Sequence, residues 1–179
     1  MKQLSSLALA LAFGATGMHA QQQVPVWLTF SGSNMATQIN LQSGAAPAAD
    51  ITLAGHSSLG VFTWHEVAAT AAAPSGTCGG PNLLSFPNVA GAGVFRFQDG
   101  SLLTTRITGG SACVNVTAGT ATLTVIDQIT GGTGMFKNVT GTLKYVINAR
   151  AILLDATMAP VLLAVNGEGS GAIVLSDTQ

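Results

Sequence analysis

Two carboxylates, Glu66 and Asp127, are the side chains that the sequence places best for acid–base chemistry. Each falls on the apolar side of a segment in which apolar and polar residues alternate. The residues expected on the same faces are Phe62 and Trp64 beside Glu66, and Leu123, Val125 and Ile129 beside Asp127. An apolar interior disfavours the ionised carboxylate and raises its pKa, which suits a general acid or base. Alternatively, both residues lie at strand ends and meet solvent or a nearby arginine. The sequence leaves both arrangements open.

Metal-dependent and serine-dependent chemistry find little support in the residues available. Only His56 and His65 follow the first twenty residues, and they form neither an HxH nor an HExxH pattern. The stretch "GHSSLG", residues 55–60, superficially resembles the GxSxG elbow of hydrolases, but strand-like sequence surrounds it and no helix signal follows. We therefore expect no metal site. The sequence favours a protein that is not an enzyme, with Glu66 and Asp127 as weak catalytic candidates.

The glycine-rich stretch Gly131-Gly132-Thr133-Gly134 raises the question of a phosphate-binding loop. A Walker loop needs GxxxxGK[ST], whereas Lys137 here follows a phenylalanine. A dinucleotide fingerprint needs a further glycine and then a helix, but the sequence continues with β-formers. We interpret Gly131, Gly132 and Gly134 as a structural turn that uses positive φ, with Phe136 filling the core beneath it. No cofactor is expected.

Alternation of apolar and polar residues between glycine turns predicts an all-β protein, because helical spacing is nearly absent after the first twenty residues. The polar and Ala/Pro-rich segments 31–49 and 68–88 are interpreted as long loops. Period two slips by one residue near Gly60, which predicts a bulge or bend within a single strand. The expected strands are 24–30, 50–67, 93–97, 101–108, 120–130, 142–150, 160–166 and 170–175.

The stretch "FRFQDGSLLTTRI", residues 95–107, predicts a hairpin whose register can be chosen by segregation of side chains. A three-residue loop, 98–100, with Gly100 left-handed pairs Phe95 with Leu103 and separates the apolar face from Arg96 and Arg106. A two-residue loop would mix these faces. The aromatic residues on the apolar face are the candidates for lining a ligand pocket: Phe62, Trp64, Phe95 and Phe97.

The first twenty residues have the layout of a signal peptide, with a basic start, a short apolar run and small residues before Ala20. We expect cleavage after Ala20, with Gly17 as an alternative, and a single domain over residues 21–179. No later segment has the roughly 18 apolar residues that a membrane helix needs. In an exported protein the pair Cys78 and Cys113 predicts one disulfide, worth about 3–4 kcal/mol in the chain-entropy model.

Charged residues make up 7% of the chain and the formal net charge is −1, which gives no electrostatic reason to expect nucleic acid as a partner. The stretch "ITGGTGMFKNVTGTL" resembles the ITGGTGRFxGATGxL segment of a group of exported bacterial proteins that are similar to allene oxide cyclase and dirigent barrels. The stretches "LAGHSSLGVFTW" and "FRFQDGSLL" resemble two further segments of that group. Two positions depart from the pattern, Met135 and Asn138. The resemblance implies one antiparallel β-barrel of about eight strands with an apolar interior.

The function that these observations favour is binding of a small hydrophobic ligand in the barrel of an exported protein, in the periplasm or outside the cell. A cyclase- or isomerase-like enzyme acting in an apolar barrel cavity is one alternative, as the related plant proteins act on hydrophobic substrates. A structural surface protein, either a fimbrial-type subunit or an outer-membrane barrel, is another. A homo-oligomer is compatible with each of these.

Overall fold

The computed structural model describes residues 22–175, which form strands and turns with a single short 3₁₀ helix. No helix in this part of the chain is long and apolar enough to cross a membrane. The predicted cleavage site at Ala20 lies outside the described residues. The strands are β1 (Gln22–Leu41), β2 (Gly44–Ser57), β3 (Gly60–Thr70), β4 (Gly76–Thr77), β5 (Leu83–Phe97), β6 (Leu102–Asn115), β7 (Thr120–Gly132), β8 (Thr140–Leu154) and β9 (Pro160–Leu175), and the 3₁₀ helix η1 spans Gly134–Phe136.

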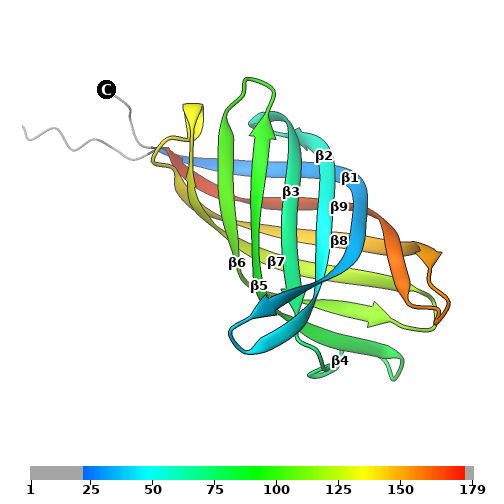
Figure 1. Cartoon of the computed structure of the whole chain (residues 1–179). Coiled ribbons are helices and arrows are strands. Elements are labelled where there is room, and N and C mark those ends of the chain that lie inside the picture. Colours follow the sequence, from blue (N-terminus) through cyan, green and yellow to red (C-terminus); the bar gives the residue numbers. More distant parts are fainter. Residues whose placement is uncertain (1–21, 176–179) are drawn as a thin grey trace, which may run out of the picture.

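Eight of these strands close into an antiparallel barrel, which confirms the predicted fold class. The strand order is β3-β2-β1-β9-β8-β7-β6-β5, and pairing of β3 with β5 completes the ring. The two-residue strand β4 pairs with the first part of β5, outside the ring. The strands wrap around the barrel axis, with the β5–β6 hairpin at one end and the β6–β7 and β8–β9 turns at the other (Figure 1).

The segment around Gly60 differs from the prediction of one bent strand. Gly60 has φ of 122°, and Ser57 pairs directly with Gly60, so the chain reverses there and forms the β2–β3 hairpin. The slip in parity therefore marked a turn between two strands. Glycine is suited to both roles because it alone adopts positive φ at low cost.

The long loop predicted over residues 31–49 is wrong, because these residues form the ends of β1 and β2. The β1–β2 hairpin extends past the last residues that pair with β9 and β3. There it continues as a two-stranded ribbon with most of its side chains in solvent. Exposure on both faces explains why the segment lacks apolar alternation. The predicted break between 166 and 170 is also wrong, since β9 is continuous through Gly167 and Gly169.

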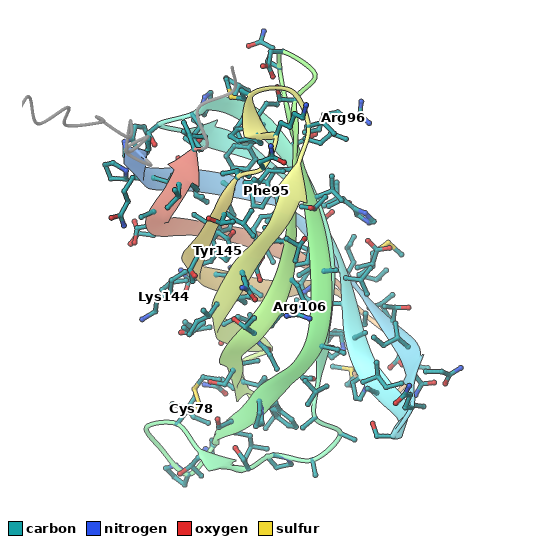
Figure 2. The ribbon with its side chains drawn as sticks, turned by 90° about the vertical axis from the view of Figure 1, so that its left-hand side faces the viewer. Cys78, Phe95, Arg96, Arg106, Lys144 and Tyr145 are labelled. Carbon is teal, nitrogen blue, oxygen red and sulfur yellow. A yellow bond between two sulfur atoms is a disulfide. The ribbon has the colours of Figure 1, made fainter. Side chains whose placement is uncertain are left out.

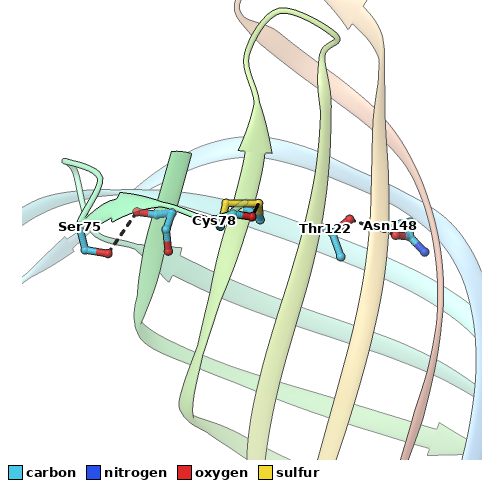
Figure 3. Close-up of a disulfide and its surroundings, with 6 residues drawn as sticks. Ser75, Cys78, Thr122 and Asn148 are labelled. Atoms are coloured by element: carbon cyan, nitrogen blue, oxygen red, sulfur yellow. Dashed lines mark hydrogen bonds between the residues drawn. A yellow bond between two sulfur atoms is a disulfide. The ribbon is translucent and has the colours of Figure 1, made fainter. Parts of the chain in front are cut away.

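The segment 68–88 is a loop only in its middle, since β3 extends to Thr70 and β5 begins at Leu83. The Cys78–Cys113 disulfide is confirmed and fastens this loop to β6, with an S–S distance of 2.00 Å. Figure 3 shows the bridge beside a hydrogen bond that the Ser75 hydroxyl donates to the Ser85 carbonyl, 3.3 Å long. The loop is thus held at the barrel end where β6 finishes.

The β5–β6 hairpin has the predicted three-residue loop. Phe95 pairs with Leu103, the N–H of Phe97 donates to the Ser101 carbonyl, and Gly100 has φ of 86°. At the same barrel end the glycine-rich stretch leaves β7 and enters η1, where Gly134 has φ of 59° and Phe136 is buried. The Phe136 ring lies 4.6 Å from that of Phe97, centroid to centroid.

Alternation along the strands separates an apolar interior from a polar exterior. On β8, Tyr145 points into the barrel while its neighbour Lys144 points away from it (Figure 2). The apolar side chains of all eight barrel strands merge into one core. Any binding site inside the barrel would therefore be lined by residues of this core.

Candidate functional site

Polar side chains form a cluster in the middle of this apolar core. Glu66 and Trp64 come from β3, Thr105 from β6, Asp127 from β7 and Tyr145 from β8, and each is no more than 2% exposed. We call these five residues the interior polar cluster. Glu66 and Asp127 therefore lie inside the barrel, not at strand ends facing solvent.

The sheet register explains how β3 and β6 bring polar groups together across the intervening strand. Glu66 pairs with Gly93 of β5, and Gly93 pairs with Thr105 of β6. A β-carbon built on Gly93 would lie 2.6 Å from Trp64 Nε1, 3.0 Å from Glu66 Oε2 and 3.2 Å from Thr105 Oγ1. The missing side chain at Gly93 thus creates the space on which the polar atoms converge.

The polar atoms of the cluster lack hydrogen-bond partners of ordinary geometry within the described part of the chain. They are both carboxylate oxygens of Glu66 and of Asp127, Trp64 Nε1, Thr105 Oγ1 and the Tyr145 hydroxyl. An unsatisfied buried polar group costs about 1–3 kcal/mol, and more if it is charged. Native proteins carry few such groups, and clusters of them are typical of functional sites.

Burial sets the protonation of this cluster. Desolvation, and secondarily the negative charge of Asp127, hold the pKa of Glu66 well above its usual value. Desolvation also raises the pKa of Asp127, although its polar neighbours Thr105 and Glu66 partly offset the rise. The pKa of Tyr145 is raised in turn by burial and by the two carboxyl groups. The two carboxyl groups therefore favour their protonated forms more strongly than exposed carboxyl groups do, and a protonated carboxyl group can act as an acid.

The four aromatic residues singled out in the sequence pack against one another at the core. Trp64 stacks on Phe95 at a centroid distance of 4.8 Å, and Phe62 contacts Phe95 at 5.3 Å and Phe97 at 6.1 Å. Two further rings join them, those of Phe30 and Tyr145. Close packing of this kind fills the middle of an eight-stranded barrel.

Glycines on the inward faces of other strands make room for these rings. A β-carbon at Gly167 would lie 2.7 Å from the Phe30 ring, and one at Gly55 would lie 2.9 Å from the Phe62 ring. The β-carbon of a residue at Gly169 would meet the Tyr145 ring at 2.5 Å. Glycines at alternate positions of β9 were a usable signal in the sequence: they mark where large side chains approach the backbone.

The two ends of the barrel differ in the space they leave. At the end with the glycine-rich turn, the interior hollow beside Phe62, Phe95 and Phe97 measures only about 10 Å³, and a more open hollow of about 350 Å³ lies over Leu59, Gly60 and Met135. At the opposite end, the turns after β6 and β8 surround a cavity of about 470 Å³, which we call the mouth cavity. Its wall combines the inward residues Val114, Ala121, Ala151 and Leu163 with the turn residues Val116, Leu154, Met158 and Pro160, among others.

The mouth cavity is mainly apolar and is separated from the interior polar cluster by packed side chains. Leu123 and Ile147, which pair across β7 and β8, lie between Ala121 at the cavity and Val125 and Tyr145 deeper inside. Arg150 is the one charged residue that lines it. Sequence patterns did not reveal this cavity, because its wall comes from two turns and four strand ends far apart in the chain.

The other residues considered from the sequence lie away from both places. His65 is on the outside of the barrel, where its Nε2 lies 2.8 Å from Asp50 Oδ1. Within residues 22–175, no three histidine, cysteine, aspartate or glutamate side chains gather in a way that could hold a metal ion. The "GHSSLG" stretch forms the β2–β3 turn, with Ser57 Oγ donating to the Gly60 carbonyl at 2.9 Å.

Comparison with known proteins finds likeness in structure alone. No protein-family model matches the chain, and no curated protein sequence matches it either. Among solved structures, the chain is similar to that of the pterocarpan synthase dirigent protein GePTS1, with a TM-score of 0.42 and 10% sequence identity. The match covers 89% of this chain and 88% of the other. Similarity at this level carries no information about the side chains of either site.

Proposed function

We propose that the protein is exported and binds a small, mainly apolar molecule in the mouth cavity. The observation that carries this proposal is the cavity itself: about 470 Å³ of space at one end of an otherwise filled barrel, walled mostly by Val, Ala, Leu, Met and Pro. Small-molecule sites typically enclose about 300–1,000 Å³ and combine apolar walls with few polar groups. The filled core beneath the cavity makes a rigid floor.

In this proposal Phe62, Trp64, Phe95 and Phe97 do not line the site, because their rings pack against one another deeper in the barrel. The disulfide stabilises the rim, since Cys113 lies next to Val114, a residue of the cavity wall. An eight-stranded barrel has room for one small ligand at most, which agrees with a site at the mouth rather than through the whole interior.

Export is supported by the disulfide, as such bonds persist in oxidising compartments. The apolar side chains face inward and polar ones such as Lys144 face outward, whereas an outer-membrane barrel carries an apolar outer band. We propose that the mature chain begins at Gln21. Intact-mass measurement of protein from its own host tests this, and a mass that retains residues 1–20 would contradict it.

Titration with the apolar fluorophore N-phenyl-1-naphthylamine tests the cavity directly. Ala151→Trp should occupy part of the cavity and weaken binding at least tenfold, because Ala151 and its partner Leu163 both line the cavity wall. The matched control is Val94→Trp, on the outward face of β5, which should bind as the unmodified protein does. Equal binding by the two variants, or no binding by the unmodified protein, would refute the proposal.

The interior polar cluster supports a second candidate function, proton transfer to a bound apolar substrate by the Glu66–Asp127 pair. Its raised pKa values and its burial in an apolar core are the properties of a general acid held ready in an apolar site. This function requires the side chains between the mouth cavity and the cluster to move. If Glu66→Gln and Asp127→Asn leave any turnover unchanged, the pair has no catalytic role.

A further inference from the structure

The outer face of the barrel carries an exposed tryptophan among mostly polar side chains. Trp27, on β1, is 57% exposed. In the sheet register it pairs with Ser170 of β9, which pairs with Lys144 of β8. Two residues further along, Thr29 pairs with Glu168, which pairs with Val146. These six outward residues form a grid two rows deep and three strands wide, which we call the Trp27 face.

The Trp27 face is hollowed and its backbone is firmly held. A groove of about 510 Å³ runs over it, lined by all six residues. The carbonyl of Trp27 accepts a hydrogen bond from the Ser58 N–H at 3.0 Å, so the start of β1 is fastened to the β2–β3 turn as well as to both neighbouring strands. The indole is therefore presented from a rigid sheet.

The side chains around Trp27 limit the kinds of molecule that could bind to this face. Within the described residues, Lys144 and Glu168 take part in no ion pair and no side-chain hydrogen bond. The Lys144 ammonium and the Glu168 carboxylate are therefore available to a ligand. Their opposite charges cancel, which disfavours a strongly anionic or cationic partner. The apolar surface amounts to one indole and one valine, which is too little for a lipid surface or a stable protein interface.

A carbohydrate chain satisfies these conditions. A pyranose ring has an apolar C–H face that stacks on an indole, and a rim of hydroxyls that both donate and accept hydrogen bonds. Ser170 and Thr29 can do either, Lys144 donates and Glu168 accepts. We propose that the Trp27 face binds a neutral, linear, β-linked polysaccharide lying along the groove. This site is independent of the mouth cavity and opens on a different surface of the barrel.

Isothermal titration calorimetry with cellohexaose and chitohexaose tests the proposal. At least one hexasaccharide should bind the full mature protein. Trp27→Ala should weaken binding at least tenfold, while Trp27→Phe should retain part of the affinity because it preserves a stacking ring. The control is Met35→Ala, eight residues along the same strand and also outward, with Met35 55% exposed. It should leave binding unchanged.

Three results would overturn the proposal. The first is that neither hexasaccharide binds, and the second is that Trp27→Ala binds as well as the unmodified protein. The third is concentration-dependent self-association in analytical ultracentrifugation that Trp27→Ala abolishes, which would assign the face to a second copy of the chain. Binding of N-phenyl-1-naphthylamine is unaffected by any of these results, so failure here is distinguishable from failure of the mouth-cavity site.

Discussion

Replacement of Glu66 by glutamine should change how the stability of the protein depends on pH. The pKa of Glu66 is raised in the folded state by burial and by Asp127, so between the unfolded pKa and the folded pKa the folded protein binds one more proton than the unfolded chain. Stability is then fully present at low pH and is lost as the pH rises through this window. Glutamine cannot ionise, so the variant should lose this dependence.

The magnitude follows from proton linkage. One carboxyl group that is protonated in the folded state and ionised in the unfolded chain costs about 1.4 kcal/mol per pH unit, from an unfolded pKa of about 4.3 up to the folded pKa. Asp99 and Asp155 do not obscure the effect. Turn hydrogen bonds, to the Ser101 N–H and the Thr157 hydroxyl respectively, lower the pKa of each. Their contribution is therefore complete well below pH 5.

Urea denaturation at pH 5, 6, 7 and 8, with the disulfide intact and tryptophan emission as the signal, measures the effect. The free energy of unfolding of the unmodified protein should fall with pH, and that of Glu66→Gln should fall by up to about 1.4 kcal/mol less per pH unit. Glu168→Gln, on the exposed outer face, is the matched control and should behave as the unmodified protein. A flat or rising stability of the unmodified protein from pH 5 to 7, or parallel curves for it and Glu66→Gln, would refute the reasoning.

Two further predictions concern the supports of the fold. Replacing both Cys78 and Cys113 by serine should lower the free energy of unfolding by about 3–4 kcal/mol, measured by urea denaturation; an unchanged midpoint would mean that the loop is held without the bridge. Gly93→Ala should cost about 1–3 kcal/mol, because the new methyl group would lie 2.6 Å from Trp64 Nε1, whereas Gly109→Ala, whose nearest contact is 3.7 Å away, should cost much less. Equal stability of these two glycine variants would show that the cluster around Gly93 is loosely packed.

The parts of the fold that the sequence predicted are those determined by local alternation. The β5–β6 register followed from keeping Arg96 and Arg106 off the face of Phe95. Parity placed Glu66 and Asp127 on apolar faces, but it left open whether they lie inside the barrel or at strand ends in solvent. Tyr145 and Thr105 carried the same signal. Each alternates with apolar residues on its own strand, but neither was singled out from the sequence.

The errors arise where local alternation is absent or where distant strands meet. Most of the residues 31–49 lie in a two-stranded ribbon that is largely exposed on both faces, so polarity did not distinguish this segment from a loop. Glu66 and Asp127 come from β3 and β7, which are not neighbouring strands. Their approach inside the barrel therefore depends on the tilt and stagger of the strands. The mouth cavity depends on two turns and four strand ends, whose convergence no single segment encodes.

Native mass spectrometry of the protein purified from its own host tests the central claim, that the mouth cavity holds a small apolar molecule. A bound species of one defined small mass is expected on the unmodified protein and on Val94→Trp, and it should be absent from Ala151→Trp produced in the same host. A protein that carries no bound molecule and also fails to bind N-phenyl-1-naphthylamine, or a bound species that persists in Ala151→Trp, would contradict it.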